Sequence, residues 1–398
     1  MNEKVPRHGA PEAPSPESRT ATGALYGGFL LSGVVTTLLG PILPALASRW
    51  SLGDAQSGTL FMAQFLGNTL GATGSGALIA RWGYRRTLGV SMLLTAAGVA
   101  GLGAAGHVLG LFCIALYGVG LGVLIPATNL LVAATHPKRA AGALNFLNFC
   151  WGLGAVAWPL AAARFLLRGG PLQLLEPLAA VLAVWSAAYF CLRIKAPEPQ
   201  LENAPAGHIL QPDVGFFVLL GSMCFLYVGT ENAFAGWIAT YVKRLVSEPG
   251  QMWMAMPSYF WGALLAARLA APWVLKHWAE RTVVSAGLFG ATAGSVVLLL
   301  SHSTAVMVSA IVLVGLGLGP VYPTLIAWMT QKRPHPLRHT ASYIFAVSGL
   351  GGATLPLLVG VVAGRALSLR AGLAVVCASC FTLVVLELWI SRRSRRLI

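Results

Sequence analysis

Long apolar segments separated by short polar turns dominate the sequence. A helix that crosses the apolar core of a bilayer needs about 20 mostly apolar residues. Segments of that length, bounded by charged or turn-forming residues, predict twelve transmembrane helices, over residues 22–46, 57–80, 87–106, 109–134, 141–165, 175–194, 214–241, 250–275, 283–301, 304–329, 340–363 and 370–390. The chain is therefore expected to be an all-α membrane protein.

The second half of the chain repeats the first. GVGLGVLIPATNLL at 118–131 matches GLGLGPVYPTLIAW at 315–328, and the Gly, Leu and Pro positions of 152–160 recur in 349–357, both at an offset of 197 residues. Two matches at one offset indicate a duplication. Because each half carries six helices, both copies have the same orientation in the membrane. We expect two six-helix bundles related by pseudo-two-fold symmetry.

Polar segments set the predicted boundaries of these bundles. The stretch KAPEPQLENAPAGHILQPD, rich in Pro and charge, is typical of a linker. We expect a disordered cytoplasmic tail over 1–20, an N-terminal bundle over 21–194, a cytoplasmic linker over 195–213, a C-terminal bundle over 214–391 and a basic cytoplasmic tail over 392–398.

Composition and charge agree with a membrane location. Only 10% of the residues are charged and 56% are apolar, whereas soluble domains carry about 25% charged residues. The net charge is +15, but the sequence has no basic helix of the kind that contacts nucleic acid. Of the 27 basic residues, 19 lie on the side of the N-terminus and 7 on the other side. The positive-inside rule then predicts a multi-pass protein of the cytoplasmic (inner) membrane with both termini cytoplasmic.

The six cysteines all lie in apolar segments, which indicates neither a disulfide framework nor a zinc site. No nucleophile, base or metal cluster stands at catalytic spacing, so we do not expect an enzyme, a metal or a cofactor.

A glycine- and arginine-rich turn joins the second and third predicted helices. It reads GALIARWGYRRTL at 76–88 and resembles the signature Gly-x-x-x-Asp-Arg-x-Gly-Arg-Arg of the major facilitator superfamily. The matching, gating-related positions are Gly76, Arg81, Gly83, Arg85 and Arg86. Ala80 replaces the acid and Tyr84 one basic residue, so the charge relay that this acid serves in the family is not expected here.

Three further segments, 143–160, 225–242 and 259–271, resemble the fucose, galactose and glucose symporter branch of that superfamily and related glucose-transporter-like members. This resemblance implies sugar transport with cation symport. Symporters of the branch use a carboxylate in the first or fourth span. Residues 22–46 and 109–134 contain no Asp or Glu, so either the chain transports without proton coupling or the coupling group lies elsewhere.

Three charged residues fall well inside predicted spans. Glu231 lies deep in the seventh, where a carboxylate usually faces a cavity, so it is our candidate for proton coupling or for binding substrate hydroxyls. Glu387 precedes Arg392 by five residues and is expected to reach the cytoplasmic surface. The resemblance assigns Arg268, in the eighth span, a structural role.

Amide and indole side chains within the spans suit a sugar. An amide both donates to and accepts from vicinal hydroxyls, and an indole offers a flat apolar face to a pyranose. The predicted substrate-binding residues are Gln64, Asn68, Asn145, Asn148, Trp151, Trp158, Glu231, Asn232 and Trp237. The alternative is that the amides bond between helices. Asn129, Tyr259, Trp261 and Tyr322 are more typical of packing.

These patterns predict a secondary active transporter that moves a small neutral solute, a monosaccharide, by alternating access. Its partners would be this solute, a coupling proton or sodium ion, and the lipid bilayer, and we expect a monomer. Two alternatives stay open: an efflux transporter for a hydrophobic or aromatic compound, and a non-transporting membrane sensor with the transporter fold.

Overall fold

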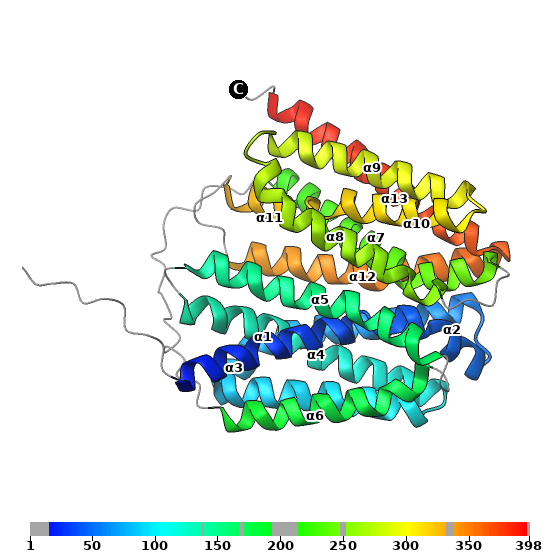
Figure 1. Cartoon of the computed structure of the whole chain (residues 1–398). Coiled ribbons are helices and arrows are strands. Elements are labelled where there is room, and N and C mark those ends of the chain that lie inside the picture. Colours follow the sequence, from blue (N-terminus) through cyan, green and yellow to red (C-terminus); the bar gives the residue numbers. More distant parts are fainter. Residues whose placement is uncertain are drawn as a thin grey trace, which may run out of the picture.

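The computed structural model describes residues 16–136, 139–166, 171–192, 214–246, 252–331 and 338–395. Every regular element in these ranges is a helix. The N-terminal half contains α1 (Pro16–Thr36), α2 (Leu39–Arg49), α3 (Asp54–Ala104), α4 (His107–Thr135), α5 (Ala140–Leu166), the short η2 (Pro171–Leu174) and α6 (Leu175–Cys191). The C-terminal half contains α7 (Val214–Leu245), α8 (Met252–Val274), α9 (Glu280–Leu300), α10 (Thr304–Leu318), α11 (Val321–Gln331), α12 (Arg338–Ala366) and α13 (Leu369–Arg395). The two halves form adjacent bundles (Figure 1).

The helices account for twelve crossings. In the described ranges, nine segments are long and apolar enough to span a bilayer, and the α1–α2 pair, bent by 42°, makes a tenth. The 51 residues of α3 exceed twice the length of one span, and the helix turns at Gly83, whose φ of 72° suits glycine. α3 therefore carries two crossings, and α8, with 23 residues, is long enough for the last. The predicted fold class is confirmed.

The helix ends differ slightly from the predicted boundaries. α1 begins at Pro16, inside the predicted tail, and α13 continues to Arg395, inside the predicted basic tail. Residues 1–15, the linker 195–213 and residues 396–398 lie outside the described residues, so these parts of the predicted organisation stay predictions.

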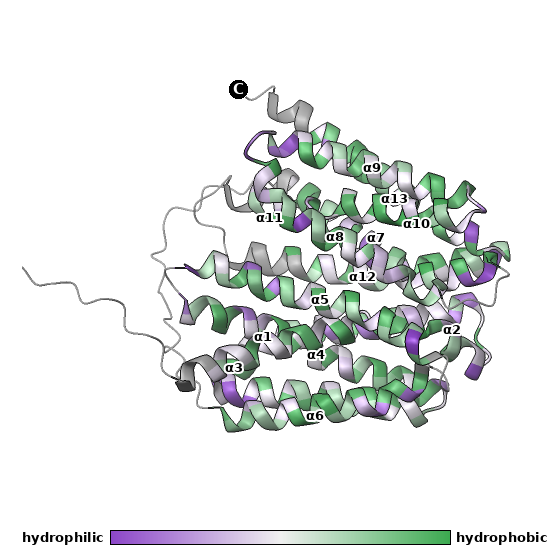
Figure 2. Cartoon of the chain, viewed as in Figure 1, coloured by the Kyte–Doolittle hydropathy of each residue, from purple (hydrophilic) through white to green (hydrophobic). Residues whose placement is uncertain are grey.

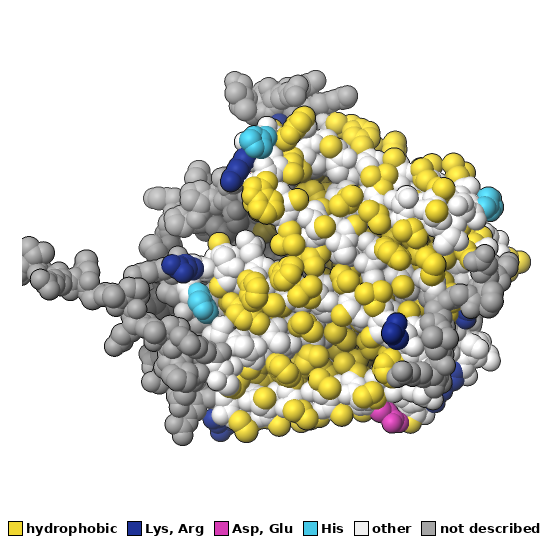
Figure 3. Space-filling view, in the orientation of Figure 1, with side chains coloured by type: hydrophobic (Ala, Val, Ile, Leu, Met, Phe, Trp, Pro, Cys, Tyr) yellow, Lys and Arg dark blue, Asp and Glu magenta, His cyan; other side chains and the backbone are white. Residues whose placement is uncertain are grey.

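The lateral surface is apolar. Large hydrophobic side chains such as Leu70, Val108 and Leu300 are 69%, 80% and 73% exposed. Hydrophobic residues cover the long faces of the helices, while charged side chains lie toward the helix ends (Figures 2 and 3). A surface of this kind faces lipid rather than water. The chain is a multi-pass membrane protein.

The two halves pack closely at one end of the bundle. We name this the outer end, following the predicted orientation. It holds the start of α3 and the end of α7, where Arg244 Nη1 donates to Asp54 Oδ2 at 2.9 Å. Gly58 of α3 packs against the α12 backbone, and the α12 residue Gly360 packs against Asp54. Glycines here allow backbones of opposite halves to touch.

The opposite, inner end is more open around α3. A Cβ at Gly349 or Gly352 of α12 would still meet Thr69 or Phe65 of α3. Further along α3, Gly76 is exposed and a Cβ there would meet nothing within 4 Å. The described contacts between α3 and α12 therefore run from the outer end to about the middle of the molecule.

Candidate functional site

The first span is interrupted in the middle, and two predicted site residues donate hydrogen bonds to the backbone at this interruption. The helix is interrupted between α1 and α2, where Pro41 lacks the N–H that an unbroken helix would donate to residue 37. Gln64 Nε2 donates to the Thr36 carbonyl at 2.9 Å, and Trp158 Nε1 donates to the Leu38 carbonyl at 3.0 Å. Backbone groups inside a membrane need such partners. Tyr117 donates to Gln64 Oε1 at 2.9 Å, so both ends of this amide are engaged.

A small cavity lies beside this break, between the two halves. The N-terminal half contributes Thr37 and Gln64, and the C-terminal half contributes Asn232 and Trp261. Phe61, Phe65, Leu39 and Ala235 are among its apolar neighbours. Its volume is about 20 Å³, which suits one water-sized group. The cavity brings together two predicted ligands, Gln64 and Asn232, at the interface of the halves.

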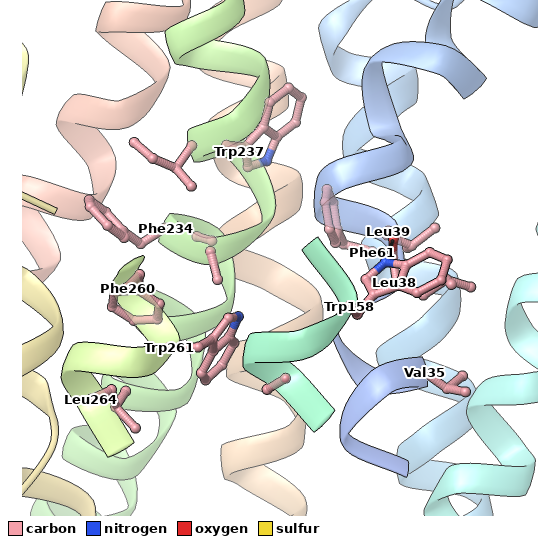
Figure 4. Packing of buried hydrophobic residues seen from close by; sticks show 14 of the residues in the cluster. Val35, Leu38, Leu39, Phe61, Trp158, Phe234, Trp237, Phe260, Trp261 and Leu264 are labelled. Carbon is pink, nitrogen blue, oxygen red and sulfur yellow. Dashed lines mark hydrogen bonds between the residues drawn. The ribbon is translucent and has the colours of Figure 1, made fainter. Parts of the chain in front are cut away.

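The cavity is closed toward the outer end by aromatic packing. The Phe61 ring of α3 and the Trp237 ring of α7 lie 6.1 Å apart across the interface (Figure 4). Trp237 is fully buried, and its Nε1 donates to the Pro356 carbonyl at 2.9 Å. Trp158 is also buried, 4% exposed. Neither indole lines the cavity, and both hold helices together.

A buried ion pair lies within the C-terminal half. Glu231 is at the midpoint of the span 218–245, and Arg268 Nη2 of α8 donates to its Oε1 at 3.2 Å. The Glu231 side chain is 10% exposed and that of Arg268 is 27% exposed. Arg268 Nε also donates to the Gly319 carbonyl at 3.3 Å. Pairing of this kind is what allows two charges to stay inside a membrane.

Two tyrosines extend this ion pair into a cluster. Arg268 Nη2 donates to the Tyr227 hydroxyl at 3.4 Å, and this hydroxyl donates to the Leu318 carbonyl at 3.0 Å. The rings of Tyr227 and Tyr322 stack with centroids 5.3 Å apart. Arg268 lies two helical turns from Trp261 on the same face of α8, toward the inner end. The cluster therefore stands below the cavity, on the more open side.

The remaining predicted ligands take different positions. Trp151 of α5 meets Trp261 edge to face, with ring centroids 5.4 Å apart. Asn145 and Asn148 are exposed, and Asn148 Nδ2 donates to a carbonyl of its own helix at 2.8 Å. Asn68 is half-buried, and its backbone packs against the glycines of α4. The structure thus does not gather all the amides around one point.

The turn that carries the family-like signature is exposed. Arg81, Arg85 and Arg86 all lie on the surface at the inner end, next to the bend at Gly83. No residue of this turn takes part in the ion pairs that the structure describes. These pairs join Arg244 to Asp54 and Arg268 to Glu231.

The expectation for Glu387 is wrong. It does not extend to the surface but is 1% exposed, and Ser285 of α9 donates to its Oε2 at 2.7 Å. A neighbouring helix offers this carboxylate a hydroxyl donor, which replaces the water that it would otherwise seek.

The sequence prediction gave too little weight to Trp261 and Tyr322 and missed Tyr227. Trp261 lines the cavity, and Tyr227 and Tyr322 contact each other beside the ion pair. Aromatic residues at helical spacing usually pack, and only their neighbours in space distinguish these from the rest.

Comparisons with known proteins agree with this architecture. The family model of the Major Facilitator Superfamily matches residues 25–356. Sodium-dependent glucose transporter 1 of Homo sapiens is 21% identical over 387 residues, which covers 86% of this chain and 73% of the relative. A Bacillus subtilis (strain 168) protein, NiaP, named as a candidate niacin/nicotinamide transporter, is 25% identical over 95% of this chain and 97% of its own length. The crystal structure of a D-xylose-proton symporter superposes with a TM-score of 0.79 at 14% identity, covering 93% of this chain and 97% of that one.

Proposed function

The chain belongs to the major facilitator superfamily, and from this premise we propose that it is a secondary active transporter for a neutral monosaccharide. In this proposal it lies in the cytoplasmic membrane with both termini in the cytoplasm. The observation that carries the substrate class is the cavity between the halves, whose polar groups are hydroxyl, amide and indole rather than charged. Such groups match the donors and acceptors of a sugar.

Alternating access is supported by the uneven packing of the two halves. Contacts between the halves at the outer end include an ion pair and backbone approaches at glycines. Toward the inner end of α3, Gly76 is exposed and a Cβ there would meet nothing within 4 Å. In the proposed cycle this arrangement is the inward-open state, and rocking of one half on the other would exchange it for the outward-open state.

Glu231 is the proposed coupling group. Its partner Arg268 compensates its negative charge in the present state. A proton bound to Glu231 would neutralise the carboxylate and weaken the pair, which changes the charge that the moving half carries. In the alternative form of the proposal, a sodium ion takes the place of the proton. In either form the cation moves together with the solute.

A second candidate function is transport of a hydrophobic or aromatic compound, in particular an aromatic carboxylate. The observation that favours it is the partly exposed Arg268 guanidinium next to the stacked rings of Tyr227 and Tyr322. A guanidinium binds a carboxylate well, and the rings would pack against an aromatic substrate. The name of the Bacillus subtilis relative points to the same class.

Counterflow distinguishes these functions. Proteoliposomes loaded with unlabelled solute are diluted into trace amounts of the labelled solute, for D-glucose, D-galactose, L-fucose, D-xylose and nicotinate in turn. We expect transient accumulation of at least one sugar and none of nicotinate. Accumulation of nicotinate alone would replace the sugar with an aromatic acid. Binding of a sugar without any counterflow would instead favour a membrane sensor.

A further inference from the structure

Trp261 differs from the other buried tryptophans that the structure describes, Trp158 and Trp237. It is 3% exposed, and its Nε1 has no hydrogen-bond partner among the described residues. Other indoles donate to a backbone carbonyl or a carboxylate at 2.9–3.0 Å, namely those of Trp50, Trp158, Trp185, Trp237 and Trp328. Buried indole N–H groups usually find an acceptor. This donor is therefore held ready for a group that comes from outside the chain.

The orphan donor belongs to the cavity between the halves. Trp261 is one of the residues that line it, and Figure 4 shows its ring on α8, beside the α5 helix that carries Trp158. Trp151 packs against the Trp261 ring edge to face, which fixes the indole in place. The space beside it admits one water-sized group and no more.

The same cavity also holds a hydrogen-bond acceptor. Asn232 donates with its Nδ2 to the Val228 carbonyl of its own helix at 2.8 Å. Its Oδ1 is then the part of the amide that is left for the cavity. Gln64, by contrast, uses its amide on Thr36 and Tyr117. The cavity thus offers a buried donor without a partner, the Trp261 N–H, and an acceptor, Asn232 Oδ1, whereas the Gln64 amide and the Thr36 and Thr37 hydroxyls already hydrogen-bond within the protein.

We propose that Trp261 Nε1 and Asn232 Oδ1 together bind a single hydroxyl group of the transported solute. A hydroxyl accepts one hydrogen bond and donates another, so it satisfies both groups at once. A carboxylate accepts but cannot donate, and it would meet the Asn232 oxygen with another acceptor. The cavity therefore selects a hydroxyl-bearing solute and rejects an aromatic acid at this point. The remainder of the solute lies on the inner side, toward Arg268.

This inference rests on the proposed sugar transport, and it is tested with monodeoxy sugars. For the monosaccharide that gives the strongest counterflow, each monodeoxy derivative competes for uptake into proteoliposomes. One derivative should bind about 5- to 150-fold more weakly than the parent sugar, because it leaves the buried donor and acceptor without partners. Trp261→Phe keeps an aromatic ring but removes the N–H with the five-membered part of the indole, and it should lower the affinity for the parent sugar and abolish discrimination against that one derivative.

Two further variants keep the test decisive. Asn232→Leu removes the acceptor and should lose the same discrimination as Trp261→Phe. Trp185→Phe is the matched control, because its indole donates to the Ala24 carbonyl away from the cavity. It should retain the wild-type discrimination. In the absence of sugar, Trp261→Phe and Trp185→Phe both lose buried volume and should unfold at a lower temperature than the wild type, and Trp185→Phe should lose more because it also breaks a hydrogen bond.

The outcomes separate the two claims. If sugar is transported and Trp261→Phe still discriminates like the wild type, the cavity holds only a water molecule and the inference is overturned, while the proposed function stands. If no sugar of the panel shows counterflow with the wild-type protein, the proposed function fails and the inference fails with it.

Discussion

The ion pair between Asp54 and Arg244 is expected to hold the outer end closed. Asp54 begins α3 in the N-terminal half, and Arg244 lies in the last turn of α7 in the C-terminal half. The guanidinium donates to both carboxylate oxygens, one of them at 2.9 Å. Separation of the halves at this end must break the pair. Replacement of Asp54 by Asn should therefore shift the equilibrium toward the outward-open state.

The size of this shift follows from exposure and geometry. The Asp54 side chain is 13% exposed and that of Arg244 is 49% exposed. Exposed pairs contribute about 0.2–1 kcal/mol, and a bidentate geometry places this pair near the upper limit, at about 1 kcal/mol. That free energy corresponds to about a fivefold change in the ratio of the two states. The interaction of Asp54 with the α3 dipole persists in both states and does not contribute.

A cysteine introduced at a buried position on the inner side of this ion pair measures the population of the outward-open state. Ala235 is 6% exposed and lines the cavity, so Ala235→Cys in a chain without the six native cysteines reacts slowly with an impermeant maleimide added outside. Asp54→Asn and Arg244→Gln should each raise the rate by about fivefold, and the double variant should raise it no further. The exchange Asp54→Arg with Arg244→Asp should restore slow labelling. Unchanged rates in both single variants would refute the latch.

Three further predictions concern stability, measured as thermal unfolding in detergent. Arg268→Gln leaves Glu231 buried without its partner and should destabilise by about 3 kcal/mol, whereas the double variant with Glu231→Gln should recover most of this loss; equal unfolding of single and double variants would contradict the pair. Gly67→Ala places a Cβ against the Ala115 carbonyl of α4 and should destabilise by about 1–3 kcal/mol, and a neutral result would mean that α3 and α4 separate easily. Trp237→Phe removes an indole hydrogen bond and should destabilise by about 1 kcal/mol, so wild-type stability would show that this bond is weak in the membrane domain.

The fold was predictable because a bilayer leaves few choices. Spans of about 20 apolar residues must be helical, and the repeat at one offset paired the two halves. Gly83 is a case in which the sequence prediction holds. The signature placed a turn there between two spans, and the φ of 72° and ψ of 167° at Gly83 interrupt the helical conformation of α3 at this residue.

The break in the first span has a local cause, because Pro41 lacks the N–H that an unbroken helix would donate to residue 37. The side chains that serve the break were not predictable: α1 ends at Thr36, α2 begins at Leu39, and Gln64 and Trp158 of other helices donate to the Thr36 and Leu38 carbonyls. These partners lie 28 and 120 residues away in the chain. The same residues were predicted as sugar ligands, since an amide that faces a substrate and one that faces a backbone carbonyl look alike in a sequence.

The charged residues show a similar division. The expense of charge in lipid singled out Glu231 and Arg268 individually. Their pairing depends on which faces α7 and α8 turn toward each other, and this orientation could not be predicted from the sequence. For Glu387, proximity to Arg392 suggested exposure, whereas packing against Ser285 determined burial.

Uptake under an ion gradient tests the central claim most directly. The monosaccharide that shows counterflow is offered to proteoliposomes with and without an inward proton gradient, and separately an inward sodium gradient, for the wild type, Glu231→Gln and the control Glu387→Gln, which alters another buried carboxylate. We predict gradient-driven accumulation in the wild type and in Glu387→Gln, and its loss in Glu231→Gln with counterflow retained. Accumulation that persists in Glu231→Gln would contradict the role of this carboxylate as the coupling group.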